Sequence, residues 1–183
     1  NTFYLARKYY TQGEVEQRKD TTGRLSPAAA DRWDKSIKQA QKVLQRYPNS
    51  KWTDDALFLI GKAYFGREEY GSARQYFQQL LDSYPNSEFA LEARFWTART
   101  WAAESDYVRA SDAFKEILAA GPPASWADQV LYAQGEVEFA REDFAGATGY
   151  YRQLAERYPN GTRVFDALTR IGDASFQRRQ WAE

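Results

Sequence analysis

The feature that most constrains this chain is a 37-residue repeat marked by proline. Tyr47-Pro48-Asn49-Ser50 recurs as Tyr84-Pro85-Asn86-Ser87 and Tyr158-Pro159-Asn160-Gly161, and Gly121-Pro122-Pro123 stands where a further copy would fall. The prolines at 48, 85, 122 and 159 are therefore in strict register. Self-similarity at such a period is typical of stacked supersecondary units, so the sequence predicts a solenoid rather than one globular core.

Within each unit the same register continues. It places a small residue at Gly61, Ala98, Gly135 and Gly172, an aromatic residue at Tyr70, Tyr107, Phe144 and Trp181, and an alanine at Ala73, Ala110 and Ala147. Apolar residues recur at helical spacing along both halves of a unit, which indicates two amphipathic helices, A and B. The small residue lets the helices approach closely, and the segments 66–69, 104–106 and 142–143 are expected to form the turns between them.

The predicted units span about 1–50, 51–87, 88–124, 125–161 and an incomplete 162–183, so we expect one solenoid that is a piece of a longer protein. The first unit is longer, because Ala6 and Trp33 are 27 residues apart where other units use nine. About 18 residues are inserted near 15–32, as an extended hairpin, a mobile loop or a docking element. Ser26-Pro27 predicts the start of a long second helix.

Composition excludes several functional classes. The chain has no His and no Cys, so Ser-His-Asp and Cys-His catalysis and the usual zinc ligand sets are unavailable, and it has no glycine-rich phosphate loop. The 25 basic and 25 acidic residues balance, which gives no field favouring nucleic acid, and no apolar run is long enough to span a membrane. We therefore expect that the chain has no enzymatic activity and binds neither a cofactor nor a metal.

Carboxylates are what remains for catalysis. Acidic pairs occur at Asp54-Asp55, Glu68-Glu69 and Glu142-Asp143, which would suit a helical glycan-cleaving domain. The stronger interpretation is structural, because the first pair lies in the first turn of a helix and the others lie in turns.

The repeat resembles the tetratricopeptide family. With Asp54 as position one of a unit, eight residues fall on the family's signature positions: Leu57, Ile60, Gly61, Tyr64, Ala73, Phe77, Leu80 and Pro85. The resemblance covers about 37–183, with Trp101, Glu138 and Ser175 departing from the position of Tyr64. It implies an all-α, right-handed superhelix (solenoid) of helix pairs. The long Tyr-Pro-Asn-Ser linker is similar to that of bacterial envelope proteins, such as the BamD lipoprotein of outer-membrane assembly and the periplasmic partner of the Tol-Pal system. This implies the periplasm or the periplasmic face of the outer membrane, with the cytoplasm left open.

The resemblance also implies a binding groove, since helices A line the concave face in this family. The predicted groove carries rings at position 5 (Phe3, Phe58, Phe95, Tyr132), rings at position 12 (Tyr10, Phe65, Phe139, Phe176) and charges at position 9 (Arg7, Lys62, Arg99, Glu136, Asp173). Such a groove, basic in its first three units and acidic in its last two, suits a protein or peptide partner. In the alternative interpretation, the position-12 rings pack between helices and the cations pair with neighbours such as Glu92.

Three functions stay open on the sequence: a protein-binding scaffold, a structural spacer or self-associating module with open ends, and a glycan-binding or glycan-cleaving domain. An exposed row of rings favours the first. Buried rings with an apolar end face favour the second. Two carboxylates about 5–9 Å apart in a cleft favour the third.

Overall fold

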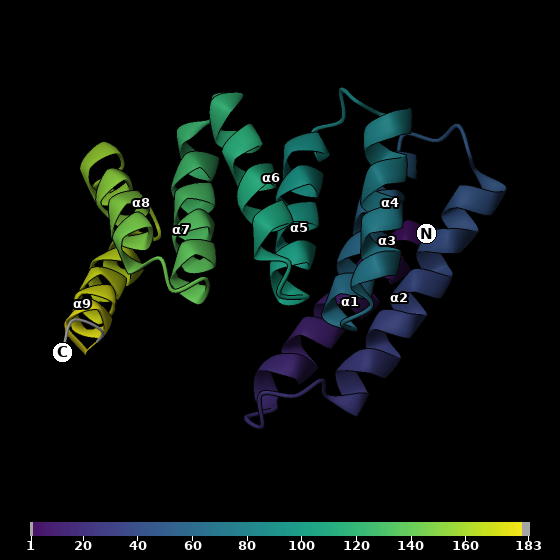
Figure 1. Ribbon diagram of the computed structural model, residues 1–183. Coiled ribbons are helices and arrows are strands. Elements are labelled where there is room, and N and C mark those ends of the chain that lie inside the picture. Colours follow the sequence, from purple (N-terminus) through teal and green to yellow (C-terminus); the bar gives the residue numbers. More distant parts are fainter. Residues whose placement is uncertain (1, 181–183) are drawn as a thin grey trace. The chain divides into compact units, whose positions relative to one another are not determined.

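The computed structural model describes residues 2–180, and their side chains as far as residue 178. Over residues 2–180 the chain forms nine α-helices and no strand: α1 (Thr2–Lys19), α2 (Pro27–Arg46), α3 (Thr53–Gly66), α4 (Tyr70–Ser83), α5 (Ala90–Ala103), α6 (Tyr107–Ala119), α7 (Ala124–Ala140), α8 (Phe144–Arg157) and α9 (Val164–Gln180). The predicted all-α class of paired helices is confirmed (Figure 1).

The chain divides into two compact units, residues 1–100 and residues 101–183, and the boundary falls within α5. In the first unit α1 packs on α2, α2 on α3 and α3 on α4. In the second unit α6 packs on α7, α7 on α8 and α8 on α9. Sequence neighbours are therefore spatial neighbours, as expected for a helical repeat.

The turns between helices A and B lie where the sequence predicts them. Glu68, Ser105 and Glu142 each adopt a left-handed backbone conformation, with φ of 62°, 62° and 65°. The next residue precedes helix B, and at two of these turns it is an aspartate that caps the helix. Asp106 accepts a hydrogen bond from the backbone N–H of Arg109 (3.1 Å), and Asp143 accepts one from Gly146 (2.9 Å). These carboxylates satisfy N–H groups that a helix start leaves unpaired.

Glycine allows helices A and B to approach closely at two repeats. A Cβ atom at Gly61 would lie within 3 Å of the Phe77 ring, and one at Gly135 would collide with the Tyr151 ring. Phe77 and Tyr151 are fully buried in the cores of their units. The close approach of two helices that the small residue predicts is thus observed for α3–α4 and α7–α8. Trp181, the last predicted aromatic position, lies outside the described residues.

The inserted residues of the first unit lengthen its two helices. α1 continues to Lys19 and α2 begins at Pro27, which leaves a seven-residue connection. The Gln17 side chain bridges this connection: its Nε2 donates to the Arg24 carbonyl (2.7 Å), and its Oε1 accepts from the Ser26 backbone N–H (2.9 Å). Ser26 occupies the N-cap position of α2, but its side chain makes no capping hydrogen bond.

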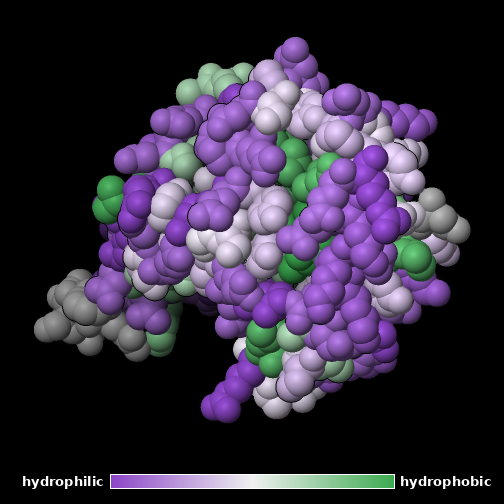
Figure 2. All heavy atoms as spheres, turned by 90° about the vertical axis from the view of Figure 1, so that its right-hand side faces the viewer, coloured by the Kyte–Doolittle hydropathy of each residue, from purple (hydrophilic) through white to green (hydrophobic). Residues whose placement is uncertain are grey.

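Trp33 explains why the extended pair holds together. Its indole lies where a Cβ atom at Gly13 of α1 or at Gly66 of α3 would come within 3 Å. The side chain is buried in the core of the first unit together with Ile37 and Val43 of the same helix face. The side of the molecule drawn in Figure 2 is mostly hydrophilic, with apolar residues visible only as narrow strips.

Candidate binding site

Three of the four position-5 rings, Phe3, Phe58 and Tyr132, contact a residue of the linker that follows their repeat. Phe3 stacks on Trp52 with ring centroids 5.3 Å apart, and Phe58 stacks on Phe89 at 4.9 Å. Within residues 101–183, the Arg163 guanidinium lies 5.3 Å from the centroid of the Tyr132 ring. Phe58 and Phe95 are each only 7% exposed. Phe58 and Phe95 therefore belong to the core rather than to an open aromatic row.

The position-12 rings pack between helices, as the alternative interpretation holds. Phe65 makes edge contacts with Tyr70 (5.3 Å) and Trp96 (4.8 Å). Phe139 makes an equivalent contact with Phe144 at 5.2 Å. Phe176 on α9 differs, because 60% of it is exposed.

Tyr10, the ring at this position on α1, is partly buried beneath the Lys62 ammonium, which lies 5.4 Å from its centroid. Burial and the neighbouring Glu14 carboxylate raise the pKa of the Tyr10 phenol.

Within residues 1–100, two of the three position-9 cations, Lys62 and Arg99, lie over aromatic rings. The Lys62 ammonium is 4.9 Å from the Trp96 ring centroid and forms an ion pair with Glu92 at 3.7 Å. The Arg99 guanidinium lies 5.0 Å from the same Trp96 ring. Trp96 therefore organises both cations, and it was not among the sequence-predicted residues.

Within residues 101–183, the two position-9 acids, Glu136 and Asp173, both pair with Arg170. Glu136 accepts hydrogen bonds from the Tyr151 hydroxyl (2.5 Å) and from Arg170 Nη2 (2.8 Å), while Arg170 also pairs with Asp173 at 3.4 Å. Burial and the Glu136 hydrogen bond raise the pKa of Tyr151, and Glu136 raises the pKa of Arg170. Much of the acidic charge predicted for binding is thus engaged inside the unit.

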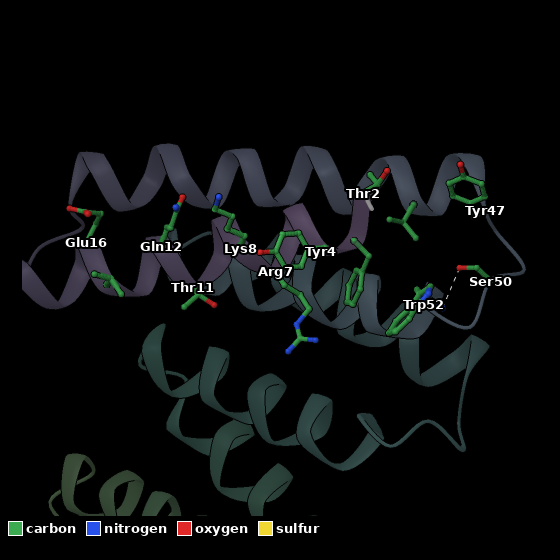
Figure 3. Close-up of a pocket in the computed structure, with 13 residues that line it drawn as sticks. Thr2, Tyr4, Arg7, Lys8, Thr11, Gln12, Glu16, Tyr47, Ser50 and Trp52 are labelled. Carbon is green, nitrogen blue, oxygen red and sulfur yellow. Dashed lines mark hydrogen bonds between the residues drawn. The ribbon is translucent and has the colours of Figure 1, made fainter.

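Residues 1–100 contain a groove of about 970 Å³ along α1, which we call the α1 groove (Figure 3). It is formed by α1, the C-terminal end of α2 and the following linker. Its lining residues are Thr2, Phe3, Tyr4, Arg7, Lys8, Thr11, Gln12, Val15, Glu16, Val43, Tyr47, Ser50 and Trp52.

The α1 groove combines exposed rings with two cations. Tyr4 is 64% exposed, and Tyr47 and Trp52 are also exposed. In Figure 3 Tyr4 lies between the side chains of Arg7 and Lys8. Glu16, the one carboxylate among the described lining residues, forms an ion pair with Lys19 (2.9 Å). The groove is therefore apolar in its walls and basic in its charge.

The structure brings two of the sequence-predicted residues, Phe3 and Arg7, into this groove. The sequence interpretation missed Tyr4, Lys8, Tyr47 and Trp52. A signal was present for Trp52, because it stands in the 37-residue register with Phe89 and Trp126, each just before or at the start of a helix A.

The acidic pairs have structural roles. Asp54 accepts a hydrogen bond from the Ser87 hydroxyl at 2.7 Å, and burial together with Asp54 and Glu88 raises the pKa of Asp55. Glu69 forms an ion pair with Arg67 at 2.8 Å. The geometry of these carboxylates thus fits helix ends and linkers better than a glycan-cleaving site.

Over the described part of the chain, no helix combines the length and the apolar character that crossing a bilayer requires.

Comparison with solved structures shows the fold. A Rap protein solved in complex with competence and sporulation factor superposes with a TM-score of 0.70 at 16% identity, covering 97% of this chain and 50% of that one. A thermophilic tetratricopeptide repeat protein of Thermus thermophilus gives a TM-score of 0.61 at 14% identity, covering 96% and 98%. A MamA protein gives 0.56 at 18% identity, covering 96% and 88%. This chain therefore spans half the length of the Rap protein.

Family comparison agrees with the repeat register. None of the curated proteins matches the chain. One tetratricopeptide repeat model matches residues 28–88 and 58–125, and a second matches residues 3–50 and 129–161. Proteins of this fold generally serve as interaction modules rather than enzymes. With its helix pairs, its glycine–ring contacts and these matches, the chain belongs to the tetratricopeptide repeat family.

Proposed function

We propose that this chain is a non-enzymatic scaffold that binds a segment of a partner protein in the α1 groove. The observation that carries the proposal is the combination of exposed Tyr4, Tyr47 and Trp52 with Arg7 and Lys8 in one groove. Apolar walls with a few fixed charges are what peptide-binding sites present. The preferred ligand is a short segment that carries aromatic or aliphatic side chains next to a carboxylate.

Electrostatics supports the acidic character of this ligand. Glu16, the carboxylate among the described lining residues, is paired with Lys19, so this side chain adds little repulsion toward a peptide carboxylate in the groove. The exposed rings, which a bound peptide would cover, would supply most of the affinity, while the cations would set orientation and association rate.

Selection from a phage library of random peptides tests this function. Enriched peptides are expected to combine apolar and acidic residues, and to bind an Arg7→Glu, Lys8→Glu double variant about tenfold more weakly or worse. The matched control is Lys38→Glu, Lys42→Glu, since both lysines lie on α2 outside the groove lining. No enrichment, or equal loss of binding in both double variants, would reject the α1 groove as the site.

We further propose a role in bacterial cell-envelope assembly, in the periplasm or at the periplasmic face of the outer membrane. The support is the Tyr-Pro-Asn-Ser sequence of the linkers at 47–50 and 84–87, which resembles the linkers of bacterial envelope proteins. Fractionation of cells that carry the natural gene tests it: the protein should appear with periplasmic or envelope markers, and recovery with cytoplasmic markers alone would reject it.

A structural spacer or self-associating module is the second candidate. The observation that favours it is the burial of Phe58 and Phe95, which removes two rings from the predicted groove. This candidate would be preferred if the phage selection enriched no groove-binding peptide and the chain self-associated in sedimentation experiments.

A further inference from the structure

The three Tyr-Pro-Asn linkers share one turn but differ at the residue that follows asparagine. Asn49, Asn86 and Asn160 are all exposed in these turns. In each linker the backbone N–H of the residue after asparagine donates to the tyrosine carbonyl: Ser50 to Tyr47 (3.0 Å), Ser87 to Tyr84 (3.0 Å) and Gly161 to Tyr158 (2.8 Å). The chain therefore presents three asparagines in nearly the same setting, and of these Asn160 alone is followed by glycine.

The third linker favours glycine because a carboxylate approaches its backbone. A Cβ atom at Gly161 would lie 2.8 Å from Asp128 Oδ2. Asp128 accepts a hydrogen bond from the Thr162 backbone N–H at 2.8 Å. Asp54, which stands in register with Asp128, instead accepts from the Ser87 hydroxyl at 2.7 Å. The third linker thus replaces a serine contact by a threonine contact, and this leaves the residue after its asparagine without a side chain.

Asparagine followed by glycine loses its side-chain amide readily, since no Cβ hinders attack by the next backbone nitrogen. The Gly161 nitrogen gives its proton to solvent and bonds to the Asn160 side-chain carbonyl carbon, and the side-chain nitrogen leaves as ammonia. Water then opens the cyclic imide. Breaking its bond to the side-chain carbonyl carbon gives aspartate, and breaking its bond to the main-chain carbonyl carbon gives isoaspartate. The net reaction consumes water and releases ammonia, and nothing is oxidised or reduced.

We propose that Asn160 is a site of spontaneous deamidation, with water as the reactant, and that opening of its linker sets the rate. In the closed linker the Gly161 N–H is engaged with the Tyr158 carbonyl, so its nitrogen is not free to attack. Attack therefore requires the turn to open, and the hydrogen bond from Thr162 to Asp128 opposes opening. The modification is accordingly slow in the folded chain and faster wherever the linker is released.

The product undoes the contact that slows its formation. An aspartate at position 160 adds a negative charge next to Gly161, whose Cβ position lies 2.8 Å from the Asp128 carboxylate, and the two like charges repel. Isoaspartate lengthens the main chain by a methylene group just before Gly161, which displaces the Thr162 N–H from Asp128. Val164 and Ala167, at the start of α9, pack in the core of residues 101–183, so deamidation should loosen the start of α9 from that core.

Mass spectrometry of tryptic peptides from the full chain tests the proposal. The folded chain is incubated at mildly alkaline pH, and an unincubated sample corrects for conversion during digestion. Cleavage after lysine and arginine places the three asparagines in separate peptides: 158–163, 47–51 and 75–94. Peptide 158–163 should acquire both acid forms, resolved by chromatography, while the other two keep their amides over the same period. No acid form in peptide 158–163, or equal conversion of all three asparagines, would overturn the proposal.

An Asp128→Ala variant tests the control by linker opening. Loss of this buried acceptor should speed conversion of Asn160 in the folded chain about tenfold, because the open linker becomes more populated. Asp112→Ala, at an exposed position on α6, is the matched control and should leave the rate unchanged. In urea that unfolds the chain, both variants and the unaltered chain should convert Asn160 at one common rate. An unchanged rate in folded Asp128→Ala, with the fold checked by circular dichroism, would contradict the role of the linker. The comparison of the three asparagines needs no variant, so it decides the site even if Asp128→Ala does not fold.

Discussion

At the scale of the residue, the turns between helices hold three residues in a backbone conformation that favours glycine. Glu68, Ser105 and Glu142 have φ between 62° and 65° and stand one repeat apart. An L-residue in this region brings its Cβ close to the backbone, at a cost of about 1–2 kcal/mol. The chain accepts this cost because the left-handed residue lets the turn reverse the helix direction and place Asp106 or Asp143 at the next helix start.

We predict that Glu142→Gly raises the free energy of unfolding by up to about 1 kcal/mol, since glycine adopts a positive φ without strain. The matched control is Arg152→Gly, at an exposed position inside α8, which should lower that free energy by about 1 kcal/mol through lost helix propensity. Urea denaturation of both variants measures the two changes. A destabilisation of the same size in both would show that the left-handed turn is not strained.

The rings show what sequence spacing could and could not predict about single residues. Spacing correctly placed small residues at Gly61 and Gly135, where two helices approach closely, but it did not pair them with the rings of Phe77 and Tyr151. It did not predict that Phe89 covers Phe58, or that Glu136 is shared by Tyr151 and Arg170. Those contacts depend on side-chain rotamers, and Phe89 and Arg170 come from the next repeat, which a position number does not contain.

At the scale of the element, a carboxylate at the start of a helix A ties down the linker that follows the same unit. Asp54 accepts from the Ser87 hydroxyl at 2.7 Å. Asp128 accepts from the Thr162 backbone N–H at 2.8 Å and from its hydroxyl at 3.2 Å. Each contact closes a unit by joining residues about one repeat apart, so the linkers that carry Pro85 and Pro159 are held at the start of the next helix.

We predict that Asp128→Ala lowers the free energy of unfolding by about 1–3 kcal/mol, because Asp128 is 2% exposed and its loss leaves the Thr162 N–H without its acceptor. Asp112→Ala, at an exposed position on α6, is the control and should stay within about 0.5 kcal/mol of the unaltered chain. Thermal unfolding followed by circular dichroism compares them. Equal stability of the two variants would mean that the Asp128–Thr162 contact does not stabilise the unit.

The inserted segment illustrates the limit of composition at this scale. Its polar residues allowed a hairpin or a mobile loop, and Ser26-Pro27 correctly marked the start of α2. That the rest lengthens α1 and α2 follows from Trp33, which packs against Gly13 and Gly66. In the sequence alone, Gly13 and Gly66 do not indicate that a tryptophan packs against them.

At the scale of the whole molecule, buried tyrosines couple stability to alkaline pH. Burial and a neighbouring carboxylate raise the pKa of Tyr10, beside Glu14, and of Tyr151, beside Glu136. In the unfolded chain both phenols return to a pKa of about 10. The stability that the raised pKa values contribute is therefore present below about pH 10 and is lost as the pH rises above it, because only the unfolded chain releases these protons.

We predict that the free energy of unfolding falls above about pH 10, with a slope of up to about 1.4 kcal/mol per pH unit for each buried phenol. Urea denaturation in buffers between about pH 8 and pH 11 measures the slope. Tyr151→Phe should flatten it, whereas Tyr47→Phe, which removes an exposed phenol, should leave it unchanged. If Tyr151→Phe kept the full alkaline slope, the Tyr151 proton would have to be released equally in the folded and unfolded states. The Glu136 hydrogen bond would then not hold that proton in the folded chain.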